Sequence, residues 1–297
     1  MKINFSKYFK TSNILSAFIF TISILFIFFK GLNYGIDFKG GTLFEIQTNK
    51  NISTLNIRDI LKNLQLGDVN VKSFGEKGNF LIKIEQSNNK ETIPFIKKTL
   101  LENLSSEINF RRVEKVGPKV SAELLKSGII SICLALFAML FYIWIRFEWQ
   151  FSLGSIIALF HDVVITLGIF SLFSIEINLS IVAAVLTIVG YSMNDTVVIY
   201  DRIRENLSKF NRINITEISD ISINETLSRT LITSVTTLLA LFSIFILGGE
   251  ILKGFSFAMI VGVFIGTYSS IFIASPVLKY LKVTSKTLEK KEENIVP

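Results

Sequence analysis

Six long apolar runs constrain the fold of this chain more than any other feature of its sequence. They cover residues 12–29, 128–145, 151–175, 177–200, 230–247 and 254–278. Each run is long enough for a helix that crosses a hydrocarbon core of about 30 Å. Hydrophobic residues make up 50% of the chain, and the mean hydropathy is +0.52. The sequence therefore predicts a polytopic α-helical membrane protein with six transmembrane helices.

The polar segment between the first two runs, residues 31–126, has the pattern of a folded domain. In residues 42–48, apolar Phe44 and Ile46 alternate with polar residues, which is typical of a half-buried strand. Spacing then predicts a helix, two strands, a helix and a strand at residues 53–66, 69–74, 80–86, 90–104 and 108–116. This βαββαβ order predicts an α+β ferredoxin-like domain between helices one and two.

Basic residues in the short connecting segments indicate how the helices are oriented. On one side of the predicted membrane lie Lys2, Lys7, Lys10, Arg146, Arg202, Arg204, Lys209, Arg212, Arg229 and the five lysines of residues 279–291. The short loops of the other side offer only Lys253, beside Glu176 and Glu250. Cytoplasmic loops carry an excess of Lys and Arg, so both termini are predicted to be cytoplasmic.

The predicted domain organisation follows from these spans and this orientation. It comprises a cytoplasmic N-terminus (1–11), transmembrane helix one (12–30), an extracytoplasmic α+β domain (31–126), transmembrane helices two to six (127–278) and a cytoplasmic Lys-rich tail (279–297). Lys30 and Gly31 follow the first run in place of a small-residue cleavage pattern, so we expect an uncleaved helix. The third and fourth runs are separated only around Glu176, which predicts a tight helical hairpin.

An aspartate lies inside the fourth apolar run, where a charge is costly. Asn194 and Asp195 both fall within residues 177–200. A carboxylate at membrane depth costs several kcal/mol unless it is paired, hydrated or neutralised, so Asp195 indicates proton or ion handling. Alternatively, helix four ends near Met193, and Asp195 is then a residue of the cytoplasmic membrane interface.

His161 and Asp162 lie in the middle of the third run. Adjacent residues on a helix point about 100° apart, so these two are not expected to share a face. A histidine titrates near neutral pH, and a neighbouring carboxylate can share protons with it. The alternative role for the pair is structural, as hydrogen-bonding groups that hold helices together.

Arg229 stands at the start of the fifth run. An arginine at a helix end commonly extends its guanidinium to the lipid phosphates. A stripe of small and polar residues follows it, consisting of Thr233, Thr236 or Thr237, and Ala240. This stripe suits a bundle interior, where Arg229 could pair with charged Asp195 and release it when it is protonated.

Small residues recur at four-residue intervals in the sixth run. They are Ala258, Gly262, Gly266, Ser270 and Ala274. Small residues in this register let another helix approach closely, so the stripe predicts tight helix packing. The pair Gly40 and Gly41 lacks the Lys-Ser/Thr of a phosphate loop, which excludes that type of nucleotide site.

Long motifs accompany all six predicted helices. They are GLNYGIDFKGGT after helix one, VGPKVSAELLKSG before helix two, ALFHDVVITLG in helix three, IVGYSMNDTVVIYDRIREN in helix four, ETLSRTLITSVTTLLA entering helix five and GFSFAMIVGVFIGTYSSIFIASPV in helix six. Together they resemble the SecF family of bacterial protein translocase subunits, a branch of the SecD/SecF group within the resistance-nodulation-division permease superfamily. The resemblance covers residues 30–277, with residues 45–115 matching by pattern only.

The resemblance implies a non-enzymatic accessory subunit of the Sec export system in the bacterial inner membrane, without a cofactor. It implies pairing with SecD, association with the SecYEG channel and YajC, an indirect link to SecA, and preproteins as the substrate. A proton or sodium gradient is implied as the energy source. Carried over by motif, Asp195 is the proton-responsive carboxylate, Arg229 its partner, and His161 and Asp162 an accompanying pair.

Two other function classes compete with this interpretation. One is a proton-coupled efflux permease for small molecules or lipids from the same superfamily. Six spans and a single extracytoplasmic domain argue against a self-contained pump, which normally has twice that complement. The other is a scaffold that stabilises a channel, in which Asp195 only packs helices together.

Overall fold

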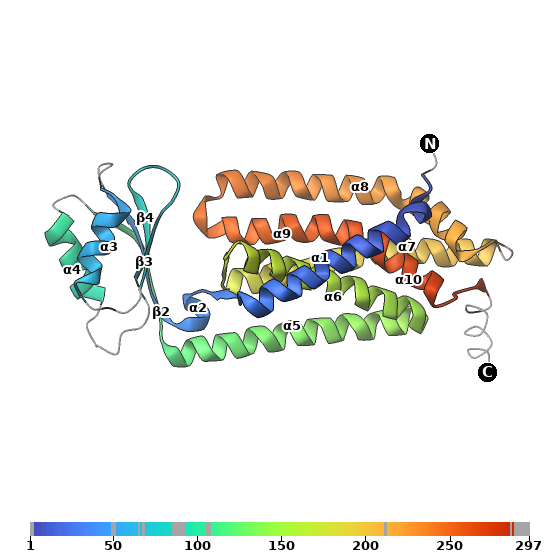
Figure 1. Ribbon diagram of the computed structural model, residues 1–297, viewed down its shortest axis with the longest axis horizontal. Coiled ribbons are helices and arrows are strands. Elements are labelled where there is room, and N and C mark those ends of the chain that lie inside the picture. Colours follow the sequence, from blue (N-terminus) through green and yellow to red (C-terminus); the bar gives the residue numbers. More distant parts are fainter. Residues whose placement is uncertain are drawn as a thin grey trace. The chain divides into compact units, whose positions relative to one another are not determined.

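The computed structural model describes residues 3–48, 52–64, 66, 69–84, 93–104, 108–210, 213–285 and 287 (Figure 1). The chain divides into two compact units. The helical unit contains Met1–Asn33, Ser131–Ile175 and Ser180–Pro297, and the sheet unit contains Tyr34–Ile130 and Glu176–Leu179.

Six helices among the described residues are long and apolar enough to cross a membrane. They are η1 (Phe5–Tyr8) continued by α1 (Phe9–Phe29), α5 (Pro118–Arg146), α6 (Trp149–Leu172), α7 (Leu179–Lys209), α8 (Ile215–Leu247), and α9 (Gly249–Ser269) continued by the π-helical turn η2 (Ser270–Ala274) and α10 (Ser275–Tyr280). The predicted polytopic helical architecture is confirmed.

Several helices extend beyond the apolar runs that predicted them. Helix α5 begins at Pro118, α7 continues to Lys209, and α8 begins at Ile215. Asn214 starts α8 as its N-cap, because its side chain accepts a hydrogen bond from the backbone N–H of Thr216 at 3.2 Å. Hydropathy marks only the apolar part of a helix, whereas caps and polar contacts decide where the helix ends.

The polar ends of α7 and α8 are joined by side-chain contacts. Arg202 Nε donates to Glu225 Oε2 at 2.6 Å, and Asn206 Nδ2 donates to Ser222 Oγ at 2.9 Å. These contacts satisfy polar groups outside the apolar runs. They explain why both helices continue past the lengths that the sequence predicted.

Helices α6 and α7 form the predicted hairpin, but the connection between them, residues 173–178, is longer than the sequence predicted. Helix α6 ends at Leu172, Ser174 has a positive φ of 52°, and strand β6 (Glu176–Ile177) precedes α7. Strand β6 pairs with β1 (Asn33–Tyr34). The connection is longer than predicted because its apolar residues prolong both hydropathy runs.

Small residues let the sixth span pack closely against α7, as the four-residue stripe predicted. Ala258, Ser270 and Ala274 are fully buried. A Cβ atom built at Gly266 would lie 2.9 Å from the Cβ of Ser192, closer than real contacts of this kind. The stripe is therefore a helix-packing surface, which confirms the interpretation made from its spacing.

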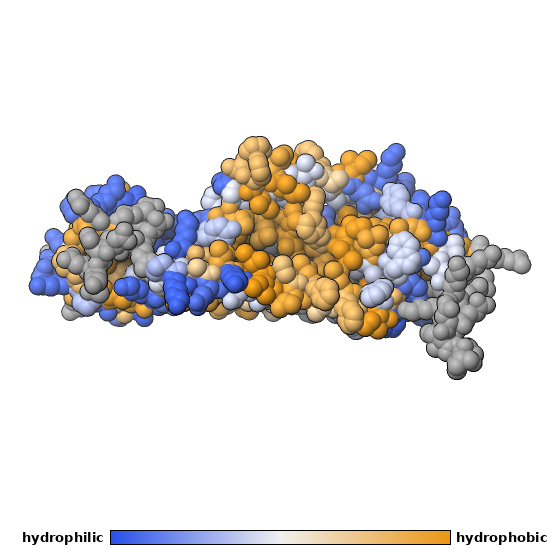
Figure 2. Space-filling view, turned by 90° about the horizontal axis from the view of Figure 1, so that it is seen from below, coloured by the Kyte–Doolittle hydropathy of each residue, from blue (hydrophilic) through white to orange (hydrophobic). Residues whose placement is uncertain are grey.

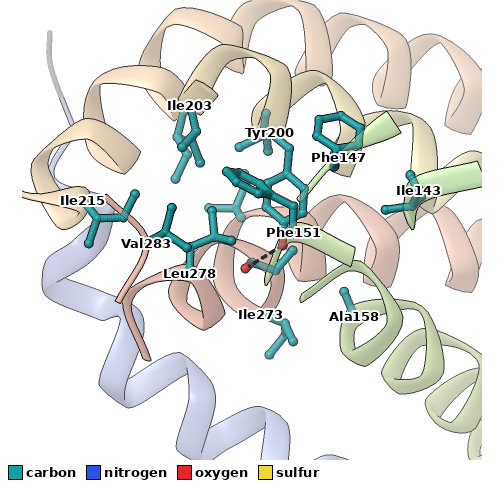
Figure 3. Close-up of a cluster of buried hydrophobic side chains, with 14 of the residues drawn as sticks. Ile143, Phe147, Phe151, Ala158, Tyr200, Ile203, Ile215, Ile273, Leu278 and Val283 are labelled. Carbon is teal, nitrogen blue, oxygen red and sulfur yellow. Dashed lines mark hydrogen bonds between the residues drawn. The ribbon is translucent and has the colours of Figure 1, made fainter. Parts of the chain in front are cut away.

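An aromatic cluster formed by Phe147, which follows α5, Phe151 of α6 and Tyr200 of α7 packs against the π-helical turn (Figure 3). Phe151 contacts Tyr200 edge-on, with ring centroids 5.1 Å apart, and Phe147 packs beside both. The Tyr200 hydroxyl donates to the carbonyl of Ala274 at 2.9 Å. A Cβ atom at Gly154 would overlap this hydroxyl, so the glycine makes room for the tyrosine. Carbonyls in a π-helical turn depart from the α-helical bonding pattern and accept such external donors.

The surface of the helical unit is rich in exposed hydrophobic side chains, and Figure 2 shows them gathered over the face in view. Examples are Phe18, Phe137, Trp144, Leu239 and Leu247. An apolar surface of this extent suits lipid, because a water-soluble protein rarely exposes so large an apolar area. The chain is a multi-pass membrane protein.

The sheet unit contains the α+β domain. Its elements are β2 (Gly41–Gln47), α3 (Thr54–Lys62), β3 (Val69–Ser73), β4 (Asn79–Ile84), α4 (Ile93–Leu104) and β5 (Asn109–Val116). The strands form an antiparallel sheet in the order β3-β4-β2-β5, with α3 and α4 on one face (Figure 1). Phe44 and Ile46 are fully buried in the core, as their alternation predicted. The element order is the predicted βαββαβ.

We expect Gly168→Ala to destabilise the helical unit. A Cβ atom at Gly168 in α6 would lie 2.7 Å from the backbone Cα of Ser23 in α1, so one helix must move. Overpacking of this kind costs about 1–3 kcal/mol. Reversible unfolding in detergent measures the loss.

The matched control is Gly190→Ala in α7. Among the described residues, a Cβ atom there would meet the Met139 Cε atom alone, at 3.9 Å, which is ordinary van der Waals contact. This variant is expected to be neutral or slightly stabilising. Equal unfolding free energies for the two variants would show that α1 does not depend on close contact at Gly168.

Candidate functional site

Asp195 lies in the interior of a continuous helix. Helix α7 runs unbroken from Leu179 to Lys209, so it does not end near Met193. The alternative that Asp195 lies at a helix end is therefore wrong. The residue is only 2% exposed and faces the interior of the helical unit.

The carboxylate of Asp195 has one weak hydrogen bond in the described part of the chain. Thr267 Oγ1 of α9 donates to Asp195 Oδ2 at 3.5 Å. The same Thr267 hydroxyl lies 2.8 Å from Ser234 Oγ of α8. A distance of 3.5 Å is at the limit for a hydrogen bond, so this buried carboxylate is poorly compensated. The three side chains nonetheless connect α7, α9 and α8.

Asp162, in contrast, is a fully buried carboxylate with strong partners. Its Oδ2 atom accepts hydrogen bonds from Ser192 Oγ at 2.5 Å and Ser269 Oγ at 2.7 Å. Its Oδ1 atom lies 2.9 Å from His161 Nδ1. These partners stand on α7, α9 and α6, so the carboxylate joins three helices. Short bonds to a charged acceptor are the strong kind.

His161 and Asp162 are both buried and in direct contact, contrary to the expectation that they take different faces. The spacing argument considered only the directions of the Cβ atoms, whereas the imidazole reaches around its own helix. The ring of His161 stacks on Phe20 of α1, with centroids 6.2 Å apart and planes at 4°. Its Nε2 atom is buried and has no hydrogen-bond partner among the described residues.

The side chains of Arg229 and Asn194 are exposed on the surface of the helical unit. Arg229 forms no direct ion pair with Asp195 within the described residues, but its positive charge acts on that carboxylate through space. Helix α8 instead turns Thr230 and Ser234 toward the bundle. The structure therefore brings Asp195 into a polar contact, brings His161 and Asp162 into another, and leaves Arg229 and Asn194 outside both.

The predicted interior stripe of α8 is right in part. Thr233 and Thr237 are half-buried, and the Tyr191 hydroxyl of α7 donates to Thr237 Oγ1 at 3.3 Å. Thr236 and Ala240 are exposed, and the buried residues of this face are Thr230 and Ser234. The apolar run gave no sign of which side of α8 would meet α9, because most of its residues suit lipid equally well.

Sequence reasoning missed the hydroxyl groups that contact the two carboxylates. These groups belong to Ser192, Ser234, Thr267 and Ser269. A possible signal was their position at the same depth as the aspartates in neighbouring apolar runs.

No group of three or more His, Cys, Asp or Glu side chains suited to a metal ion occurs among the described residues. In this arrangement the charge of Asp195, which has a weak hydrogen bond, can change while Asp162 keeps its strong hydrogen bonds.

The chain matches known sequence families over most of its length. Residues 96–284 match the family described as protein export membrane protein SecD/SecF, C-terminal, and residues 25–52 match the SecD/SecF GG motif. Protein translocase subunit SecF of Rickettsia rickettsii (strain Sheila Smith) is 41% identical over 293 residues, which is 97% of this chain and 95% of the relative. The same subunit of Rickettsia bellii (strain OSU 85-389) is 44% identical over 278 residues, covering 93% and 92%.

A solved structure shares the fold. The crystal structure of SecDF, a translocon-associated membrane protein from Thermus thermophilus, matches with a TM-score of 0.86 and 33% sequence identity. The match covers 95% of this chain and 39% of SecDF, so this chain spans well under half of that protein. The matched family, the identity to the Rickettsia subunits and the shared fold agree, and the chain belongs to the SecD/SecF family of protein-export membrane proteins, as one of its SecF translocase subunits.

Proposed function

We propose that this chain is an ion-coupled accessory subunit of the Sec preprotein translocase in the bacterial inner membrane. Its relatives are named as translocase subunits, and SecDF is described as translocon-associated. The observation that carries the coupling part is Asp195, a buried carboxylate in a membrane helix with one long hydrogen bond among the described residues. The charge of such a group is poorly compensated, so a proton or sodium ion that neutralises it strongly changes its interactions with the neighbouring helices.

The coupling step is a change in how α7 contacts its neighbours. Charged Asp195 attracts the positive charge of Arg229 and accepts a hydrogen bond from Thr267. Neutral Asp195 no longer attracts this charge. Because Ser234 bonds Thr267, the change reaches α8 and α9 as well. An ion gradient then biases two arrangements of the helices.

SecD is the partner that completes this machine. This chain corresponds to 39% of SecDF, and a SecD subunit would supply the remainder. Arg229 and Asn194 lie on the outer surface of membrane helices, where polar side chains are costly in lipid, so a second helical bundle suits them. The proposed arrangement has cytoplasmic termini, an extracytoplasmic α+β domain that acts on the preprotein, and association with SecYEG, YajC and, indirectly, SecA.

Asp195→Asn is expected to abolish the stimulation of export by the ion gradient while leaving assembly with SecD intact. Asparagine keeps the size and the hydrogen-bond acceptor but cannot ionise. Preprotein translocation into inverted vesicles, with and without an imposed gradient, measures the effect. Glu217→Gln, which removes an exposed carboxylate at the start of α8, is the control and should behave as wild type. Gradient-stimulated export by Asp195→Asn at the wild-type level would refute the coupling role.

Arg229→Ala should lower gradient-stimulated export as well, whereas Arg229→Lys should retain most of it. The proposal assigns Arg229 a positive charge that acts on Asp195 over a distance, and lysine preserves that charge. The same vesicle assay applies, with subunit abundance measured in parallel. If Arg229→Ala exports at the wild-type rate, Arg229 has no part in coupling.

Asp162→Ala is expected to destabilise the subunit, because it leaves the Ser192 hydroxyl without its acceptor, while the Ser269 hydroxyl keeps the carbonyl of Gly266 at 3.2 Å. A buried group left unsatisfied costs about 1–3 kcal/mol, so the free energy of unfolding should fall by about that amount. Asp201→Ala, which breaks a solvent-exposed pair with Arg146, should cost less than about 1 kcal/mol. A stable but uncoupled Asp162→Ala variant would instead move Asp162 from the scaffold to the coupling site.

A further inference from the structure

The segment that leads from α1 into the first strand of the α+β domain binds the connection between α6 and α7. Strand β1 pairs with β6, and the backbone N–H of Gly35 donates to the carbonyl of Ile177 at 2.8 Å. The short helix α2 (Ile36–Lys39) follows directly. This segment is the GIDFKGGT motif of the sequence, whose GID part has no role in the coupling step described above.

Asp37 of this motif caps the N-terminus of α7. Its Oδ2 atom accepts a hydrogen bond from the backbone N–H of Leu179, the first residue of α7, at 3.0 Å. The first N–H groups of a helix have no acceptor within the helix, and a negative charge there is favoured by the helix dipole. The cap comes from a distant part of the sequence, so it fixes the start of α7 to α2.

A second contact joins the same connection to the sheet. Glu176 of β6 forms an ion pair with Lys83 of β4, and both side chains are largely shielded, with 23% and 20% exposure. A Cβ atom at Gly35 would lie 2.6 Å from Glu176 Oε1, so a larger residue here would displace the Glu176 carboxylate from its present position. Residues 176–179 accordingly belong to the same compact unit as the α+β domain.

We propose that Asp37, Glu176 and Lys83 form a clamp that fixes the first turn of α7 to the α+β domain. Helix α7 is continuous from Leu179 to Asp195, a distance of about 24 Å along its axis. A helix of this kind moves as a rod, so a displacement at Asp195 reaches the domain through the clamp. Asp37, Glu176 and Lys83 are thus positioning residues for the transmission of movement. This last step rests on the proposed coupling function, whereas the clamp itself does not.

Hydrogen exchange tests the clamp without any assay of export. In the complete subunit, reconstituted in vesicles with its SecD partner, Asp37→Ala should speed exchange of the Leu179 amide about tenfold, as expected when a bond to a charged acceptor is lost. Asp37→Asn keeps an acceptor and should restore much of the protection. Asp59→Ala, at an exposed carboxylate of α3, is the control and should change nothing. Unchanged Leu179 exchange in Asp37→Ala would overturn the clamp.

Exchanging the charges of Lys83 and Glu176 tests whether the clamp transmits movement from α7 to the α+β domain. Lys83→Glu and Glu176→Lys should each lower the ratio of gradient-driven to basal export several-fold, and the double variant should recover it, because the opposite charges are paired again. Recovery at equal subunit abundance is not expected of residues that only stabilise the fold. Normal ratios in both single variants would overturn transmission through the clamp. Failure of the coupling function appears separately, as normal gradient-driven export by Asp195→Asn with the exchange result intact.

Discussion

The helical unit depends on one buried carboxylate that holds three helices together. Asp162 is fully buried, and its partners Ser192 and Ser269 stand on α7 and α9. A buried charge is tolerated only when donors surround it, so these helices must keep their relative positions for the carboxylate to remain satisfied. The close packing of α9 on α7 through Gly266 follows from the same requirement, because a larger residue would separate the two serines from Asp162.

Two carboxylates at similar depth therefore have different physical characters. Asp162 has strong, short bonds and fixes an arrangement, whereas Asp195 has, within the described part of the chain, one long hydrogen bond, from Thr267. A rigid element beside a poorly compensated charge is what a coupled machine needs, since the scaffold lets a small change at one residue move a whole helix. The competing scaffold interpretation of Asp195 would predict bonds like those of Asp162.

The spans, the βαββαβ domain, the small-residue stripe and the place of Asp195 inside a helix were all predictable, because periodicity and length carry that information. The partners of the carboxylates were not. Serine and threonine in an apolar helix often bond their own backbone, as Thr187 does to the carbonyl of Ala183. Others, such as Ser192, reach a neighbouring helix instead. Whether a hydroxyl bonds its own helix or a neighbouring one depends on how each helix is rotated about its axis. The sequence does not show this rotation, because residues that suit lipid stand on several sides of each helix.

The hydroxyl of Tyr200 occupies space that Gly154 leaves empty, and it donates a hydrogen bond to the carbonyl of Ala274 in the π-helical turn. Three helices thus meet at one oxygen atom. An alanine at position 154 would displace the hydroxyl, and a phenylalanine at position 200 would leave the carbonyl without its donor. These positions constrain one another's evolution: among related sequences, residues larger than glycine at position 154 should occur together with a replacement of the tyrosine and a regular α-helical turn at residues 270–274.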